Sequence, residues 1–205
     1  YPDNADYNEA LLEHWHQAGD IDREYHYVLP VAERLNVVLV ELKRAEEVLE
    51  RTLHALPDDP RRIALWNLLM QSYIRQDRGQ QAELLAQQAI ALAQQNNDQR
   101  GEAQALYNMS LVTYDRGDYD AAQDFSQRSL DLSTVVGDQQ CMTRALNNLG
   151  RIAYQKGDLD LSRRFHERNL ANQRDYGNQI GIATSLSNLG VVLANQGNPS
   201  QAYEY

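Results

Sequence analysis

Asparagine side chains recur in this chain at a fixed step of 40 residues. Asn108, Asn148 and Asn188 each begin a triplet of an asparagine, an apolar residue and a small residue, and a Gly-Asp or Gly-Asn pair begins seven residues after each triplet. A carboxamide both donates and accepts hydrogen bonds, so a column of these side chains could pair with successive amides of an extended peptide. The chemistry that these residues offer is recognition rather than reaction.

Catalytic residues are not evident in the sequence. Asp118, Asp120 and Asp124 could supply paired carboxylates for acid–base work, but they gather around an expected helix start, where the helix dipole and solvation explain them. No Ser-His-Asp arrangement, glycine-rich phosphate loop or Cys-x-x-Cys pair is found. We therefore expect no enzyme activity, no catalytic residues and no cofactor.

Metal ligands are equally scarce. His14 and His16 are two residues apart, so on a helix they would point about 200° away from each other and could not chelate one ion. Cys141 is the single cysteine, which excludes an internal disulfide and a multi-cysteine zinc site. No metal site is expected.

Charge and hydropathy limit the partners. The 205 residues carry a formal net charge of −10, and residues 1–60 account for −9 of it, with 14 acidic and 5 basic residues. Nucleic-acid binding requires a basic stripe, and the sequence has none. The chain also lacks a long apolar run and a secretory signal, so we expect no membrane partner and a cytoplasmic location.

The 40-residue step also predicts the elements that position these side chains. A period of this length is typical of a solenoid, in which each unit buries its apolar face only by stacking on the next. Apolar residues recur at spacings of three and four within each unit, which indicates amphipathic helices. The expected fold is all-α, an α-solenoid of stacked antiparallel helical hairpins.

The regular repeats allow helix boundaries to be predicted. Gly157 is expected to end a helix in the left-handed conformation, and Asp158 to cap the next one. A weaker first copy of the repeat occupies about 60–97. The later helices are expected at about 101–116, 119–136, 140–156, 159–176 and 180–196.

The first part of the chain follows the repeat less closely. We expect three helices there, near 6–18, 21–38 and 42–56, with Pro30 as a kink in the second. Two prolines bracket two aspartates at 57–60, where helices seldom continue. The predicted organisation is an irregular helical segment at 1–58 and an array of about 3.5 repeats at 59–205. The chain opens without methionine and stops near an expected helix start, so we expect a truncated piece of a longer protein.

The repeat resembles the tetratricopeptide (TPR) pattern. The resemblance rests on Leu146-x-x-Leu149-Gly150 with small Ser162 twelve residues on, and on the same pattern 40 residues later. The period exceeds the 34-residue form, and the terminal proline is missing. The longer period and the Asn-Leu-Gly motif are more similar to the extended repeats of kinesin light chains, Pins-type polarity adaptors and bacterial regulators related to the maltose activator.

A second resemblance covers the first 60 residues. The run Glu13-His-Trp-His-Gln-Ala-Gly-Asp20, followed by Ala32-Glu33, is similar to the segment that joins the ATPase module to the repeats in large bacterial signal-transduction ATPases. It implies a bacterial regulatory protein as the context. The chain itself has no Gly-x-x-x-x-Gly-Lys-Ser/Thr loop to hold a nucleotide.

The TPR resemblance implies a ligand groove. In that family the first helices of the hairpins line a concave surface, and the asparagine two residues before the glycine faces it. Tyrosines would add rigid contact area, and Arg144 and Arg151 could receive a carboxylate. The implied groove residues are Asn67, Tyr73, Tyr107, Asn108, Tyr114, Arg144, Asn147, Asn148, Arg151, Tyr154, Ser187 and Asn188. The alternative for each is structural, with asparagine bridging helices and tyrosine filling the seam between repeats.

Two functions remain open from the sequence. The first is a non-catalytic protein- or peptide-binding module, a sensor or scaffold segment of a larger bacterial regulator. The second is a structural spacer or self-association scaffold without a dedicated peptide ligand. It follows from the uncapped end of the array, where Leu189, Val192, Leu193 and Tyr203 lack a following repeat.

Overall fold

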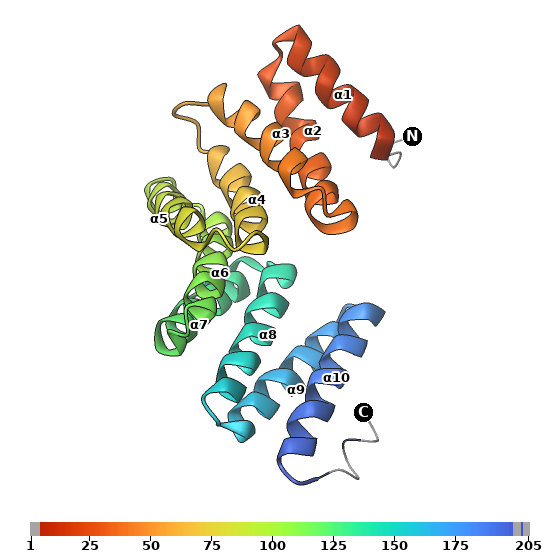
Figure 1. Cartoon of the computed structure of the whole chain (residues 1–205), viewed down its shortest axis with the longest axis vertical. Coiled ribbons are helices and arrows are strands. Elements are labelled where there is room, and N and C mark those ends of the chain that lie inside the picture. Colours follow the sequence, from red (N-terminus) through yellow and green to blue (C-terminus); the bar gives the residue numbers. More distant parts are fainter. Residues whose placement is uncertain (1–4, 199–201, 203–205) are drawn as a thin grey trace. The chain divides into compact units, whose positions relative to one another are not determined.

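The computed structural model describes residues 5–198 and 202, with the backbone alone at 5, 6 and 39. Every helix of this part of the chain is α-helical except one short π-helix, η1 (Figure 1). The first elements are α1 (Ala5–Ala18), α2 (Ile21–Arg34), η1 (Leu35–Leu39), α3 (Leu42–His54), α4 (Arg62–Arg75) and α5 (Gly79–Gln95). They are followed by α6 (Gln99–Asp115), α7 (Tyr119–Val136), α8 (Gln139–Gln155), α9 (Leu159–Asp175) and α10 (Gln179–Asn195). The fold is an all-α solenoid, as expected.

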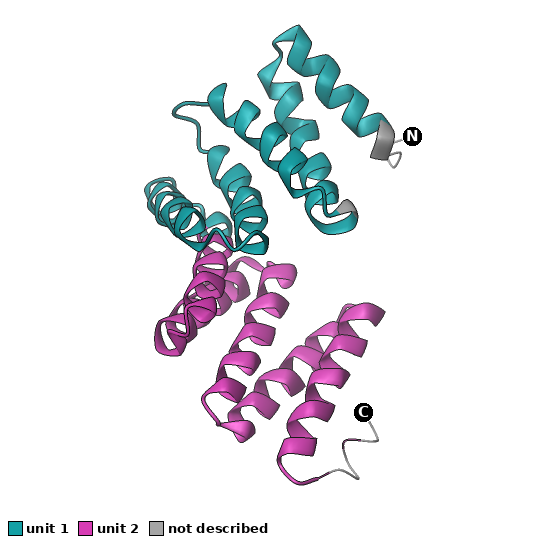
Figure 2. Cartoon of the chain, in the orientation of Figure 1, with its two compact units in different colours: residues 1–101 teal, residues 102–205 magenta. Residues whose placement is uncertain are grey.

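The chain forms two compact units, unit 1 at 1–101 and unit 2 at 102–205 (Figure 2). The division falls inside α6, whereas the division expected near residue 58 lies inside unit 1. There the turn after α3 is joined to α4 by Arg62, whose guanidinium donates to the carbonyl oxygens of Leu53 at 3.1 Å and Leu56 at 2.7 Å. The boundary at residue 58 therefore stays a prediction that rests on the change from irregular to regular repeats in the sequence.

The regular repeats form helices where the sequence predicts them. From α6 to α10 each helix begins and ends within two residues of its expected limits. Gly157 has a φ of +81°, and the carboxylate of Asp158 accepts a hydrogen bond from the Leu161 N–H at 2.9 Å. The glycine thus ends α8 and the aspartate caps α9, as predicted.

The helix expected at 21–38 is α-helical only as far as Arg34. The α-helix runs through Pro30 to Arg34, and the π-helix η1 follows it. Asn36 in η1 is fully buried, and its Nδ2 donates to the Leu68 carbonyl oxygen of α4 at 3.1 Å. This contact with a distant helix fixes the wider turn, and Val40 then leaves η1 in the left-handed conformation, with a φ of 57°.

The buried side of the second helix differs from one hairpin to the next. In α5 the buried row is all alanine, and in α7 it is one alanine and three serines, whereas α9 carries large polar side chains at the same repeat positions. The rows are Ala82, Ala86, Ala89 and Ala93, then Ala122, Ser126, Ser129 and Ser133, then Ser162, His166, Asn169 and Gln173. Glycines make room for the large members, because a Cβ on Gly150 would lie 2.5 Å from Cε1 of His166.

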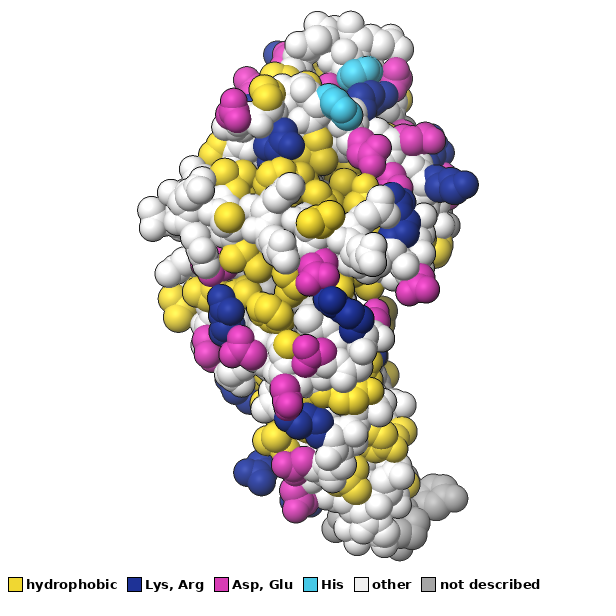
Figure 3. All heavy atoms as spheres, turned by 60° about the vertical axis from the view of Figure 1, so that its left-hand side comes forward, with side chains coloured by type: hydrophobic (Ala, Val, Ile, Leu, Met, Phe, Trp, Pro, Cys, Tyr) yellow, Lys and Arg dark blue, Asp and Glu magenta, His cyan; other side chains and the backbone are white. Residues whose placement is uncertain are grey.

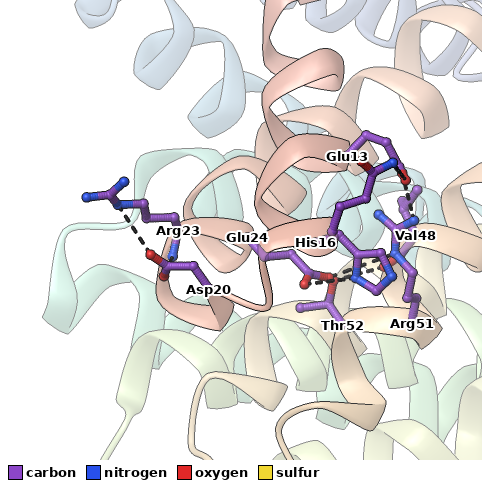
Figure 4. Close-up of polar contacts among 9 residues, drawn as sticks. Glu13, His16, Asp20, Arg23, Glu24, Val48, Arg51 and Thr52 are labelled. Carbon is purple, nitrogen blue, oxygen red and sulfur yellow. Dashed lines mark hydrogen bonds and ion pairs between the residues drawn. The ribbon is translucent and has the colours of Figure 1, made fainter.

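The first three α-helices meet at a buried carboxylate. Glu24 of α2 is 3% exposed, and it accepts a hydrogen bond from Thr52 Oγ1 of α3 at 2.7 Å. His16 Nδ1 of α1 lies 3.1 Å from its other oxygen (Figure 4). Arg51 of α3 donates to Glu13 of α1 at 2.9 Å beside this contact. One acidic side chain therefore holds α1 and α3 against α2.

Removal of this carboxylate is expected to destabilise unit 1. We expect Glu24→Ala to lower the free energy of unfolding by about 3 kcal/mol, because it leaves Thr52 and His16 without their shared acceptor. Urea denaturation followed by circular dichroism measures the change. The matched control is Glu33→Ala, which removes an exposed carboxylate from the same helix and should change stability by less than about 0.5 kcal/mol. Equal losses in the two variants would contradict a special role for Glu24.

Candidate functional site

The structure corrects the expectation that the repeated asparagines form a surface column. Asn67, Asn108 and Asn148 are only 1–2% exposed. Asn148 Nδ2 donates to Ser110 Oγ of α6 and Ser126 Oγ of α7, each at 3.0 Å. These three carboxamides lie inside the helix layer, and Asn148 joins three helices there.

Tyr73 is also buried rather than available to a ligand. Its ring is 7% exposed and its hydroxyl donates to Glu50 at 3.0 Å, while the Arg78 guanidinium lies 4.0 Å above the ring. Burial and the Glu50 hydrogen bond raise the pKa of Tyr73 to about 12. Tyr73 thus fastens α4 to α3.

The other eight predicted residues are half-buried or exposed, and all lie in unit 2. Four of them follow one another at helical spacing along α8, so they share one face of that helix. We call the set the unit 2 face. Its members are Tyr107 and Tyr114 on α6, Arg144, Asn147, Arg151 and Tyr154 on α8, and Ser187 and Asn188 on α10.

Contacts within the unit 2 face link neighbouring helices. The Arg151 guanidinium carbon lies 4.4 Å from the centroid of the Tyr114 ring, which places a cation over an aromatic face. Asn188 Nδ2 donates to Asn147 Oδ1 at 2.8 Å. Burial raises the pKa of the Tyr107 hydroxyl, against the opposing effect of the Arg144 and Arg151 charges. The structure therefore brings both arginines close to tyrosines.

The two arginines of α8 carry charges that no neighbouring carboxylate in the described part of the chain balances. Basic and acidic side chains are interspersed over the surface shown in Figure 3, and several are paired between helices, such as Lys156 with Asp120 at 2.6 Å. Among the described residues, Arg144 and Arg151 form no ion pair with a carboxylate. The neighbouring helix α10 contains no charged residue. The unit 2 face thus presents two uncompensated positive charges in an acidic protein.

Sequence comparison assigns the family. Residues 61–134 and 141–205 match the model of the tetratricopeptide repeat. The chain belongs to the tetratricopeptide repeat family. The match starts just after the prolines at 57–60 and leaves the first three α-helices outside it. No curated protein matches the chain in sequence.

Solved structures with the same fold include other repeat proteins. BtubC (BKLC) from P. vanneervenii is 19% identical, with a TM-score of 0.79 over 98% of this chain and 85% of its own. A putative kinesin light chain of Podosopora anserina is 15% identical, with a TM-score of 0.67 over 87% and 89%. A Rap protein complexed with Competence and Sporulation Factor is 14% identical, with a TM-score of 0.77 over 89% of this chain. This chain covers 52% of that Rap protein. At these identities the likeness shows the fold.

In the part of the chain that the structure describes, no helix is long and apolar enough to cross a membrane. The same residues contain no group of three or more histidine, cysteine or acidic side chains placed to hold a metal ion. Cys141 is buried, and burial raises the pKa of its thiol to about 11.

The sequence interpretation missed the carboxylate at the N-terminal junction. Glu24 falls on the buried row of α2 with Val28, Val31 and Ala32. A single charged residue on an otherwise apolar row was the available signal, since such a group must find partners when it is buried. Its partners Thr52 and His16 come from other helices, so the sequence alone does not name them.

Proposed function

We propose that this chain is a non-catalytic module that binds a protein or peptide, and that the ligand binds at the unit 2 face. The observation that carries the proposal is the pair Arg144 and Arg151, two guanidinium groups without an acidic partner beside Tyr107 and Tyr114. Support also comes from similar structures, because one Rap regulator was solved in complex with the Phr* peptide. Phr* is the ligand of that Rap regulator, and the present chain is not proposed to bind the same peptide.

The chemistry of the unit 2 face favours a ligand with a carboxylate. A guanidinium binds a carboxylate through two parallel hydrogen bonds, and it does so best where aromatic rings exclude water. The contact between Asn188 and Asn147 leaves one amino group and one carbonyl oxygen for a peptide group of the ligand. An extended segment with an acidic side chain or a chain end over α8 meets both requirements.

The wider context belongs to the same proposal. The resemblance of residues 1–58 to the junction of bacterial signal-transduction ATPases supports a sensor or scaffold segment of a larger regulator, working in the cytoplasm. In this proposal the repeats bind the ligand, and a catalytic or DNA-binding effector domain would lie elsewhere in the larger regulator.

A charge-matched pair of double variants tests the proposal. Peptides selected from a random display library on the intact chain should be enriched in acidic residues. We expect Arg144→Ala with Arg151→Ala to weaken binding of a selected peptide by about tenfold or more, or ~1.4 kcal/mol. The control replaces Arg164 and Arg168, exposed arginines of α9, and should leave the affinity within about twofold. Equal affinity of the two double variants would overturn the assignment.

Leu189, Val192 and Leu193 of α10, which were expected to lack cover, are only 1–3% exposed, and Tyr203 lies outside the described residues. Self-association is still the second candidate, because two other apolar side chains of α10 are exposed. Ile180 is 82% exposed and Val191 is 52% exposed. Exposed apolar side chains tend to be covered by a partner, which can be a second copy of the chain. Light scattering that shows only monomer at high concentration would count against this function.

A further inference from the structure

Unit 1 contains a groove that shares no residue with the unit 2 face. It lies between α1 and α3, which both pack against α2, and its volume is about 560 Å³. Both helices contribute charged and apolar side chains to the lining. They are Glu9, Ala10, Leu12 and Glu13 from α1, and Arg44, Glu47, Val48 and Arg51 from α3.

Ion pairs across the groove hold its two walls in place. Arg44 pairs with Glu9, and Arg51 pairs with Glu13 at 2.9 Å. Arg51 also lies 3.9 Å from buried Glu24, at the junction drawn in Figure 4. Long charged side chains therefore span part of the space between α1 and α3. Of the apolar lining, Leu12 is buried, whereas Ala10 is exposed and Val48 is half-buried, so these two remain available to a partner.

The charge of the groove is negative once these pairs are counted. Both arginines are already engaged by carboxylates, whereas Glu47 is exposed and has no hydrogen bond or ion pair among the described residues. Glu24 adds a further carboxylate below the wall. The surrounding residues 1–60 carry a net charge of −9, which would steer a basic partner toward this region and repel an acidic one.

We propose that the groove between α1 and α3 docks a basic amphipathic helix of a partner protein. A cavity of this volume accepts a few side chains, so the partner helix would lie along the groove and insert one face. Apolar side chains of that face would contact Ala10 and Val48, and a lysine or arginine beside them would pair with Glu47. The site is separate from the unit 2 face and does not depend on the function proposed there.

Two synthetic peptides test the docking site on the full chain. The first is a fluorescein-labelled amphipathic helix of leucine and lysine, and the second has glutamate in place of every lysine. Fluorescence anisotropy should show binding of the lysine peptide alone. We expect Glu47→Lys to weaken that binding by about tenfold or more, because it removes the free carboxylate and adds a repelling charge. Glu47 is exposed, so this change leaves the fold intact.

The control variant separates the groove from general acidity. Glu33→Lys reverses an exposed charge of α2 that does not line the groove, and it should change the affinity by less than about twofold. The bound peptide should also slow hydrogen exchange at 9–13 and 44–51. Equal weakening by the two reversals, equal binding of the two peptides, failure of both to bind, or protection elsewhere would each overturn the proposal. The variant with Arg144 and Arg151 replaced should bind the lysine peptide normally, so failure here is distinguishable from failure of the peptide site in unit 2.

Discussion

Gly150→Ala is expected to lower the free energy of unfolding by about 3 kcal/mol. The new Cβ would lie 2.5 Å from His166 Cε1, in a site where His166 is 3% exposed. Ser162 Oγ of α9 donates to the Gly150 carbonyl oxygen at 2.8 Å, so the two helices cannot separate without loss of a buried hydrogen bond. Urea denaturation followed by circular dichroism gives the change in stability.

The preceding repeat supplies the compensating change. At the positions of Gly150 and His166 that repeat has Ser110 and Ser126, which both accept hydrogen bonds from Asn148. The double variant Gly150→Ser with His166→Ser copies this pair, and we expect it to unfold within about 1 kcal/mol of the native chain. A harmless Gly150→Ala, or a double variant as unstable as the single one, would contradict the close packing of α8 on α9.

The period of the sequence was sufficient to predict the helices of the regular repeats. Gly157 and Asp158 mark a helix end and a helix start through their own backbone and side-chain chemistry, so no distant partner is needed to place them. The π-helix η1 was not predictable in this way. Its register depends on the contact of Asn36 with the Leu68 carbonyl oxygen, 32 residues away in sequence.

At the candidate site, the main difference from the sequence prediction is the position of the repeated asparagines. They were expected at the surface, but most lie inside the helix layer. The TPR resemblance implied a ligand contact for the recurring asparagine, with a bridge between helices as the alternative, and Asn148 forms the bridge. For Asn148 the partners are serines 38 and 22 residues earlier in the chain. The next repeat has glycine and histidine instead, and there Asn188 bonds to Asn147 at the surface. Partners outside its own triplet therefore decide whether a repeated asparagine lies in the interior or at the surface.

The positions of the two arginines could be predicted from the sequence more completely than those of the asparagines. Arg144 and Arg151 are seven residues apart on one helix, which puts them on the same face whatever the tertiary structure. The contact of Arg151 with Tyr114 depends on the packing of α8 beside α6. The lack of an acidic partner is likewise a property of the folded chain, since a carboxylate from any neighbouring helix could have paired with either guanidinium.

Loss of stability at acidic pH is the second large effect that we expect, and His166 is its source. Burial alone lowers the pKa of this histidine from 6.5 to about 4 in the folded chain. The folded state therefore favours the neutral ring, whereas the unfolded chain takes up a proton near the ordinary pKa. Its contribution to stability is complete above about pH 6.5 and is lost as the pH falls toward 4, by up to about 3 kcal/mol.

Comparison of urea denaturation at neutral pH and near pH 4 should show this loss in the native chain and a smaller loss in His166→Ser. Serine is the residue at the same position of the preceding repeat, Ser126, where it is fully buried, so the substitution is compatible with the helix pair. The control is His26→Ser, which removes an exposed histidine from α2 and should keep the acid sensitivity of the native chain. Because carboxylate titration is common to all three proteins, only the difference between them reports on His166. Parallel loss of stability in the native chain and in His166→Ser would show that this buried ring does not set the acid limit of unit 2.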